Sequence, residues 1–324
     1  MHRLTRREFL AASAVGGAGL IVGCGTPFPT PSLRDPGPAR RRIWVFADSH
    51  IGLAGRANDG RDGADWTRLS IADAREDLMP IDYVLALGDV THNAGREDQL
   101  RTYVDIKKAS GLGPWYELAG NHDHAALPAG RWRRYVRRPA RYVLLDGTAA
   151  IFFISAEQGK SDGKVSPDVA RWLQAGIEHY QDTHNIIVCT HQAVWHTVAG
   201  ATESSCCLNH RVLISRILKR TRVDLWLCGH IHGGRRSAAF VTQKDRTVFV
   251  NVAALGHAYG TGACHSYVLD MERGSGQLVA RCRVHDRNTW AFDQEVRLEA
   301  PHAWRFAARP TVVPARLRSF AKAS

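Results

Sequence analysis

The 324-residue sequence has few cysteines, no internal repeat and no long uninterrupted apolar run. Seven cysteines are too sparse for the disulfide framework of a small secreted scaffold. Without a repeat of fixed period, the chain does not have the pattern of a solenoid or a propeller. No stretch reaches the roughly 20 apolar residues that a membrane-spanning helix needs. These absences favour a globular chain with a hydrophobic core of its own.

Acidic residues are outnumbered by basic ones, 31 to 43, which gives a formal net charge of +12. Such an excess attracts anions at long range. Much of it is arginine, notably in 131–138, where guanidinium groups suit phosphate oxygens. A solvated basic face, or contact with anionic lipid headgroups, explains this run at least as well.

The N-terminal region resembles an export signal. Arg6 and Arg7 precede a weakly apolar segment, 11–22, that is too short to cross a bilayer and is followed by Cys24. This layout resembles a twin-arginine signal peptide over 1–23 with a lipoprotein cleavage box. It implies export to the periplasm or outer face and lipidation of Cys24, which would bind the protein to the membrane surface. An ordinary N-terminal anchor, or cleavage without lipid, is the alternative.

The proline-rich residues 24–42 suit a semi-rigid tether, and the folded part is expected to span 43–300, with a basic C-terminal tail over 301–324. Nearly 300 residues allow one large α/β layer structure or two lobes. Ser166 followed by Pro167 is a strong helix start. Helices are expected at 67–79, 97–110, 166–181 and 208–219, and strands at 247–252, 265–270, 277–284 and 290–298.

Five short polar blocks each lie next to a strand-like apolar run, and the runs include 43–47, 83–87, 186–190 and 225–228. Such runs indicate strands buried on both faces. In layered α/β sheets, ligands bind beyond the carboxyl ends of the strands, so side chains far apart in the sequence converge there. The blocks are Asp48-Ser49-His50, Gly88-Asp89, Gly120-Asn121-His122-Asp123, His191 and Gly229-His230-Ile231-His232.

The spacing inside the blocks has local reasons. An extended backbone sends Asp48 and His50, and likewise His230 and His232, to one side. Glycine before a donor residue allows a sharp bend and a close approach of backbone to an ion. Carboxylates, imidazoles and an amide together indicate a hydrolytic site with two metal ions.

These blocks, in this order, resemble those of the calcineurin-like metallophosphoesterase family, DxH, GD, GNH(D/E), H and GHxH, over residues 43 to 255. The resemblance implies an α/β fold in which two sheets form a sandwich flanked by helices, in four layers α/β/β/α. It also implies that Asp48, His50, Asp89 and His232 hold one metal, and that Asp89, Asn121, His191 and His230 hold the other. His122 would contact substrate and assist the leaving group. Asp123 would orient His122, or would instead cap a helix or accept a hydrogen bond behind the metal ligands.

Paired metals suit phosphate ester hydrolysis because they lower the pKa of bound water and bind phosphoryl oxygens. His and Asp ligands suit two first-row transition-metal ions, such as Fe, Mn or Zn. A hydroxide shared by the metals would attack phosphorus in line, and His122 would donate a proton to the departing alkoxide. A basic lipoprotein that binds nucleic acid or another anionic polymer without chemistry is the less favoured alternative.

The block after Asp89 departs from that of the purple acid phosphatases, in which a tyrosine lies three residues after the bridging aspartate. His92 stands there, so a purple enzyme is not expected. Residues 88–95 resemble the GDxTDxG block of the family's compact phosphodiesterases, except at His92. A phosphodiesterase-like activity is therefore expected, with a phosphomonoesterase as the alternative.

Several residues have open roles. Cys189 and Cys228 are expected to be packed core residues. Cys264 and Cys282 are equidistant from Arg273 in a hairpin-like turn, so a disulfide and a non-bonded pair are both open. The adjacent Cys206 and Cys207 have no interpretation. Possible pocket-wall residues are His196, His257 and Asn251.

Overall fold

The computed structural model describes residues 38–55, 59–155, 157, 163–202, 207–209, 211–232, 240–256 and 264–315. The predicted signal peptide, Cys24 and most of the predicted tether lie outside these residues. Within them, no helix combines the length and the apolar character that crossing a membrane requires.

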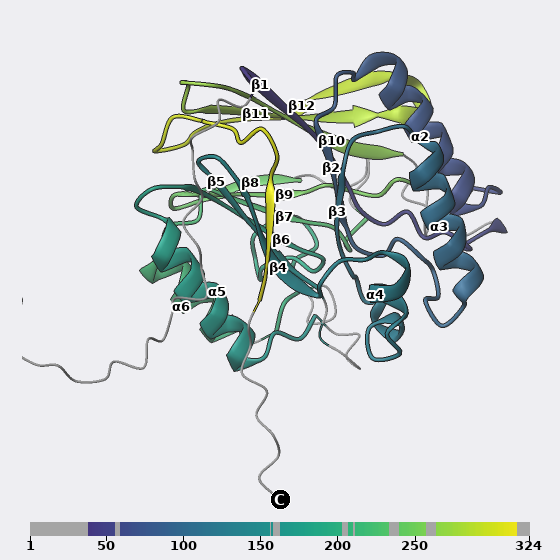
Figure 1. The fold of residues 1–324 in the computed structure, drawn as a ribbon, viewed down its shortest axis with the longest axis horizontal. Helices are drawn as coiled ribbons and strands as arrows, with labels where there is room; N and C mark the ends of the chain where they lie inside the picture. Colours follow the sequence, from purple (N-terminus) through teal and green to yellow (C-terminus); the bar gives the residue numbers. More distant parts are fainter. Residues whose placement is uncertain are drawn as a thin grey trace, which may run out of the picture.

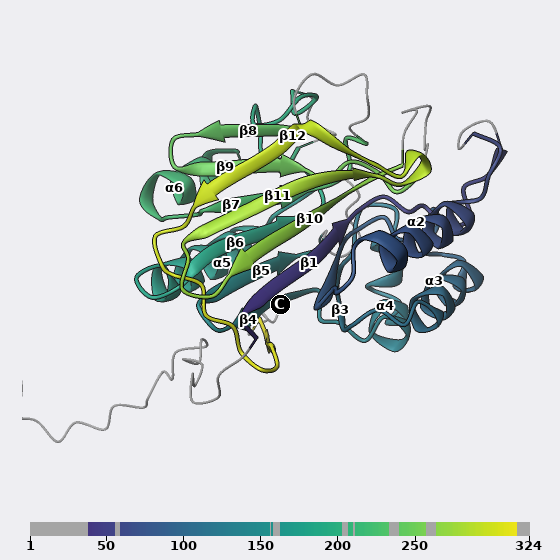
Figure 2. The same ribbon diagram turned by 90° about the horizontal axis from the view of Figure 1, so that it is seen from above.

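Two mixed sheets stack face to face, with helices α2 and α3 on one side and α5 and α6 on the other (Figure 1). The strand order of the first sheet in the described residues is β12-β11-β10-β1-β2-β3, and Figure 2 looks onto this sheet. Its strands are β1 (Arg40–Phe46), β2 (Tyr83–Leu87), β3 (Trp115–Leu118), β10 (His265–Glu272), β11 (Gln277–Val284) and β12 (Thr289–Glu299).

The second sheet has the order β13-β4-β5-β6-β7-β9-β8 in the described residues. Strands β5, β6, β7 and β9 are parallel, as β1, β2 and β3 are in the first sheet. Its strands are β4 (Arg141–Asp146), β5 (Ala149–Ile154), β6 (Asn185–Thr190), β7 (Leu225–Cys228), β8 (Val241–Lys244), β9 (Thr247–Asn251) and β13 (Thr311–Pro314).

Successive side chains of a strand point to opposite faces of its sheet, so the two sheets divide the core into three layers. In β1, Ile43 and Val45 pack between the two sheets, whereas Trp44 and Phe46 pack toward α2 and α3. A third cluster fills the space between the second sheet and α5 and α6. Strands buried on both faces need apolar residues at every position, which explains their continuous apolar runs. The predicted four-layer α/β/β/α sandwich is confirmed.

The helices lie close to their predicted positions. Helix α5 (Pro167–Tyr180) begins as expected, with the Ser166 side chain accepting a hydrogen bond from the amide of Val169. Helix α2 (Gly63–Asp77) begins four residues before the prediction, because Asp62 caps it. The other helices are α3 (Glu97–Ala109), α4 (Arg131–Tyr135) and α6 (Arg211–Arg220), with short 3₁₀ turns η2 (His124–Ala126) and η5 (His285–Arg287).

The chain beyond residue 300 packs into the fold, so the boundary predicted at residue 300 is too early. Trp304 and Phe306 are buried between the sheets. Thr311–Pro314 then pairs with β4 as an edge strand of the second sheet. In the sequence, this segment has only short groups of apolar residues, separated by arginine and proline, and no long apolar run, so no strand was predicted there. The fold therefore includes residues 301–315.

Cys264 and Cys282 are free thiols, so the disulfide considered from the sequence does not form. The register of β10 and β11 pairs Tyr267 with Cys282, three positions away from the pairing that symmetry about Arg273 implied. Cys264 also packs toward α2, whereas Cys282 packs between the sheets. The two thiols thus lie on opposite faces of one sheet. Cys189 and Cys228 are buried and free, as expected.

Candidate active site

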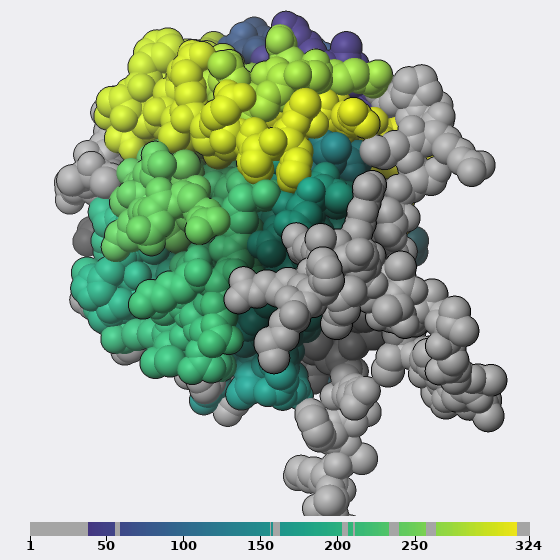
Figure 3. Space-filling model, turned by 90° about the vertical axis from the view of Figure 1, so that its left-hand side faces the viewer, coloured from purple at the N-terminus to yellow at the C-terminus, as the bar shows by residue number. Residues whose placement is uncertain are grey.

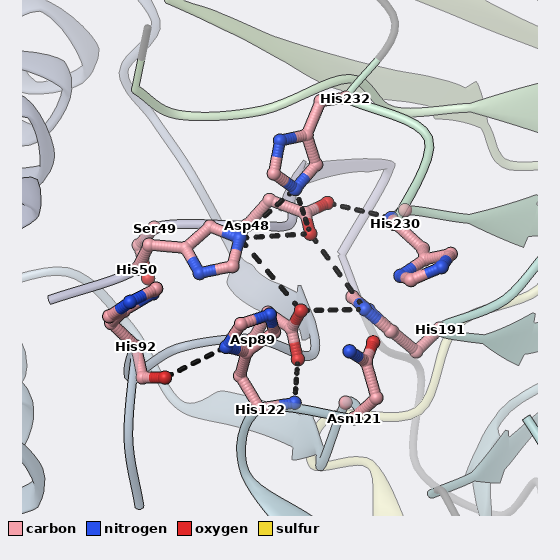
Figure 4. A network of polar contacts seen from close by, with 12 residues as sticks. Asp48, Ser49, His50, Asp89, His92, Asn121, His122, His191, His230 and His232 are labelled. Carbon is pink, nitrogen blue, oxygen red and sulfur yellow. Dashed lines mark hydrogen bonds and ion pairs between the residues drawn. The ribbon is translucent and has the colours of Figure 1, made fainter. Parts of the chain in front are cut away.

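The polar blocks converge beyond the carboxyl ends of strands from both sheets (Figure 4). Strands β1, β2 and β3 of the first sheet deliver the blocks that begin at Asp48, Gly88 and Gly120. Strands β6 and β7 of the second sheet deliver His191 and the block that begins at Gly229. One region of the fold therefore brings together all nine residues proposed for the site: Asp48, His50, Asp89, Asn121, His122, Asp123, His191, His230 and His232.

Two groups of side chains are close enough to hold a metal ion each. Asp48, His50 and His232 form one group, in which Nε2 of His232 lies 3.0 Å from Oδ1 of Asp48. Asp89 and His191 form the other group with His230, and Nε2 of His191 lies 3.0 Å from Oδ2 of Asp89. All these side chains are buried except His230, which is half-buried.

Asp89 lies between the two groups. Its Oδ2 is 3.0 Å from Nε2 of His191 in one group and 3.8 Å from Nε2 of His50 in the other. Its Oδ1 accepts a 2.8 Å hydrogen bond from the amide of His122. A carboxylate in this position can face two cations at once, which is the geometry that a bridging ligand requires.

The backbone at the site is strained rather than extended. Five residues of the site have φ values between 43° and 66°, which residues other than glycine rarely adopt. They are Asp48, His50, Asp89, His230 and His232. The extended spacing predicted for the two paired motifs is therefore wrong, because both follow the ends of their strands. Left-handed residues turn the chain sharply there, and neighbouring loops hold them in place.

Backbone hydrogen bonds fix these strained loops to one another. The amides of Asp48 and His50 donate to the carbonyls of Gly88 and Asp89, at 3.0 and 2.9 Å. The amide of His230 donates to Oδ2 of Asp48 at 2.8 Å, across the two sheets. Such cross-links maintain conformations that a free loop would abandon.

Glycines are required where the loops approach the metal-binding side chains. A Cβ on Gly120 would lie 2.2 Å from Oδ1 of Asp89, and one on Gly88 would lie 2.7 Å from Nδ1 of His191. A Cβ on Gly229 would lie 2.4 Å from Cβ of Ala47 and 2.7 Å from Oδ2 of Asp48. These glycines therefore let the loops pack directly against the candidate metal-binding side chains.

The donor chemistry of the site fits transition-metal ions. Nδ1 of His191 lies 2.8 Å from the carbonyl oxygen of Leu87, an arrangement in which Nδ1 donates and Nε2 can bind a metal. Burial would raise the pKa of Asp48, but His232 and His191 outweigh it and hold that pKa well below its usual range. Burial opposes a charge on His191, yet Asp89 and Asp48 raise its pKa to about 10. The ionised carboxylates thus attract cations, and metal ions compete with protons for the same imidazoles.

The open side of the site is formed by half-buried residues, among them Asn121 and His122. The Nδ1 atom of His122 lies 2.8 Å from the carbonyl oxygen of His92, and its ring is 4.8 Å from that of His50. Asn121 Oδ1 accepts a 3.4 Å hydrogen bond from Gln192. His122 is therefore oriented by backbone and remains partly exposed.

Asp123 does not orient His122. Its buried carboxylate accepts hydrogen bonds from the amides of Val90, Thr91 and Gly120 and from the Thr91 hydroxyl, at 2.8 to 3.1 Å. It makes no capping hydrogen bond to the 3₁₀ turn that follows. Burial and the nearby charge of Asp89 raise the pKa of Asp123 to about 6. Asp123 holds the loops after β2 and β3 together, which is a supporting role.

His92 is closer to the site than the sequence indicated. Its ring stacks on that of His122 at 5.0 Å, and it forms a third candidate group with His50 and His122. Its position three residues after Asp89 was the available signal. Asn251, considered as a pocket-wall residue, donates to the carbonyl of Gly229 at 2.6 Å and supports the turn before His230.

Two of the remaining residues with open roles have contacts that the structure describes. His196 is exposed, and its carbonyl accepts a hydrogen bond from Lys244. Within the arginine-rich run, Arg138 pairs with buried Glu117 at 3.2 Å, so this guanidinium has a structural partner. His257 and Cys206 lie outside the described residues.

Comparisons with known proteins agree with this geometry. The model of the family described as calcineurin-like phosphoesterase matches residues 41–234. Tartrate-resistant acid phosphatase type 5 from Rattus norvegicus is 26% identical over 204 residues, and that from Homo sapiens is 24% identical. Each match covers 51% of this chain and 61% of the relative, so the chain spans less than two thirds of these relatives.

Solved structures show the same fold at low sequence identity. A purple acid phosphatase from yellow lupin seeds superposes with a TM-score of 0.60 at 15% identity, over 82% of this chain and 55% of that one. GAP50, the anchor in the inner membrane complex of Plasmodium, gives 0.59 at 12% identity, over 82% and 90%. The fold thus occurs in proteins that are named for different roles. The family assignment therefore depends on the match to the family model and on the site, and not on these structures. By that match and that site, the chain belongs to the calcineurin-like phosphoesterase family.

Proposed function

We propose that this protein hydrolyses phosphate monoesters at a centre of two metal ions. One ion would be held by Asp48, His50, Asp89 and His232, and the other by Asp89, Asn121, His191 and His230. The observation that carries the proposal is the position of the Asp89 carboxylate, whose Oδ2 faces His191 at 3.0 Å and His50 at 3.8 Å.

The chemistry follows from the donors. Two bound metal ions supply an activated water molecule and neutralise charge on the phosphoryl oxygens. His122 lies on the open side, where its Nδ1 proton is committed to the carbonyl of His92. In the imidazolium form its Nε2 proton is then available to the departing oxygen.

Monoesters are favoured over the diesters expected from residues 88–95. The curated relatives with sequence similarity are named acid phosphatases, and their similarity extends over half of this chain. The diester expectation depended on a short block that departs from its pattern at His92. Because His92 replaces the tyrosine of purple enzymes, a colourless phosphatase that contains Fe, Mn or Zn is proposed.

Location is a second part of the proposal. The arginine pair, the short apolar segment and Cys24 support export by the twin-arginine route to the periplasm or outer face, with a lipid anchor at Cys24. That route carries folded proteins, so metals can be loaded before export. If Cys24 is lipidated, we expect globomycin treatment to change the measured mass of the protein. We expect the Cys24→Ser variant not to show this change.

The test of activity uses purified protein that is stripped with a chelator and then reloaded separately with Fe, Mn or Zn. We expect hydrolysis of p-nitrophenyl phosphate to vanish on stripping and to return on loading, with bis(p-nitrophenyl) phosphate cleaved more slowly. Faster cleavage of the diester would instead support the phosphodiesterase-like activity expected from residues 88–95. No hydrolysis by metal-loaded protein, with salt-sensitive binding of an oligonucleotide, would favour a binding protein without chemistry.

A further inference from the structure

A groove of about 640 Å³ runs along helix α6, on the side of the molecule away from α2 and α3. Its walls come from α6, from the loop after β6 and from the β8–β9 hairpin. In the left half of Figure 3 the hairpin lies above the helix. Much of the lining is apolar and includes Trp195, Leu218 and Phe249. Volume and lining are those of a site for an organic ligand.

The rim of this groove is strongly basic. Asp245 is the only acidic residue among those that line the groove in the described chain. None of the basic residues of the rim forms an ion pair with a described carboxylate, whereas nearby Arg222 pairs with Asp224 at 3.1 Å. The exposed basic residues are Arg211, Arg216, Lys219, Arg220, Lys244 and Arg246.

Charge and apolar lining together specify the ligand. A purely ionic partner would leave the apolar lining in contact with water, and a purely apolar partner would leave the cations without counter-charges. An amphiphile with an anionic head satisfies both. Val212, which is 71% exposed on α6 beside the groove, adds an apolar side chain at the same surface. Basic helices with exposed apolar residues bind anionic bilayers in this way.

We propose that this groove binds an anionic phospholipid at a bilayer surface. The acyl portion lies against Leu218 and Phe249, and the headgroup lies on the cations of α6 and of the β8–β9 hairpin. This contact does not depend on the metal site or on Cys24. It orients the domain with α6 toward the membrane.

The first test compares two triple variants of the full chain, which share the same N-terminus. Arg216→Gln, Lys219→Gln and Lys244→Gln remove three cations from the rim. As a matched control, Arg75→Gln, Lys108→Gln and Arg133→Gln remove three exposed cations from α2, α3 and α4. Cosedimentation is measured with vesicles of phosphatidylcholine alone and of phosphatidylcholine with phosphatidylglycerol.

We expect the parent chain to prefer vesicles that contain phosphatidylglycerol. The rim variant should lose about a hundredfold in partitioning, at the usual strength of basic residues near an anionic surface, and the control should lose far less. Equal losses in both variants, or equal binding to the two vesicle types, would overturn the proposal. Rim-dependent binding of an oligonucleotide without vesicle binding would assign the face to nucleic acid instead. Thermal unfolding verifies that both variants are folded.

A second test separates a lipid site from a simple anion site. Ser215→Phe places a ring in the groove from an exposed position on α6 and keeps every charge. Lysophosphatidylglycerol is titrated in the presence of a chelator, so that the metal site does not contribute. We expect Ser215→Phe to abolish this binding and inorganic phosphate not to compete. Unchanged binding, or displacement by phosphate, would contradict a site that holds an acyl chain.

Discussion

The backbone amide of His122 donates a 2.8 Å hydrogen bond to Oδ1 of Asp89. The residue proposed to assist the leaving group is thereby tied to the carboxylate proposed to bridge the metals. Oδ2 of that carboxylate faces His191 and His50, as Figure 4 shows. One side chain therefore contacts both candidate metal-binding groups and also fixes the loop that carries His122. Measuring metal content and turnover together distinguishes the bridging role proposed for Asp89 from the leaving-group role proposed for His122.

Asp89→Asn should remove metal and activity together. The amide keeps the shape of the side chain but loses the negative charge that lies between the two groups of imidazoles. We expect reconstituted protein to hold fewer than two metal ions and kcat to fall by about 10³-fold or more. Elemental analysis and phosphatase assays check this. The control is Asp105→Asn, an exposed carboxylate on α3. Two bound metals with full turnover in Asp89→Asn would rule out the bridging role.

His122→Ala should separate metal binding from turnover. His122 is not one of the proposed ligands, so metal content should stay at two ions while kcat falls by about 10²- to 10⁴-fold. The loss should be larger for an alkyl phosphate than for p-nitrophenyl phosphate, because a phenolate with a low pKa needs less help from a proton donor. An equal loss for both esters would contradict proton donation by His122.

Much of the site was predictable because its functional residues form short motifs of neighbouring residues in the sequence. Each block lies at the end of a strand whose apolar residues identify it, and parallel strands bring their carboxyl ends to one edge. The apolar runs therefore predicted the positions of β2, β7 and β11 correctly, and Asp48, Asp89 and His191 lie close together as expected.

Other features depended on contacts that a local pattern does not contain. The left-handed backbone at Asp48 and His230 is held by hydrogen bonds from other loops, so spacing alone suggested extended chain. The role of Asp123 was open between orienting His122, capping a helix and accepting a hydrogen bond, and only its contacts with amides of the loop after β2 decide for the last. The register of β10 and β11 is set by burial of alternate faces, and symmetry about Arg273 did not reveal it.

Gly229→Ala should weaken metal binding through Asp48. The added methyl group would lie 2.4 Å from Cβ of Ala47 and 2.7 Å from Oδ2 of Asp48, so the end of β1 or the carboxylate must move. We expect a stability loss of about 1–3 kcal/mol and about 10- to 100-fold weaker metal binding. The double variant with Ala47→Gly should regain stability but not affinity. Recovery of both would show that the Asp48 contact is unimportant.

A second buried network joins helix α2 to the end of β11. Arg283 donates to both carboxylate oxygens of Asp73, at 2.9 and 2.5 Å, and to Asp77 at 2.6 Å. Nδ1 of His285 lies 2.6 Å from Oδ2 of Asp73. Burial would raise the pKa of Asp73, but the hydrogen bonds from Arg283 and His285 outweigh it and lower that pKa to about 2.

This network predicts a specific loss of stability in acid. Because the pKa of Asp73 is lower in the folded state, its stabilising effect is complete above about pH 4 and is lost as the pH falls toward 2. Asp73→Asn should cost about 3 kcal/mol near neutral pH, since Arg283 keeps its charge with fewer partners, and should flatten the dependence of stability on pH between 4 and 2. Urea unfolding across this range measures both effects. Asp65→Asn, in an exposed pair with Arg68 on the same helix, should change little at any pH. If Asp73→Asn unfolds with the same acid dependence as the parent, the network does not account for it.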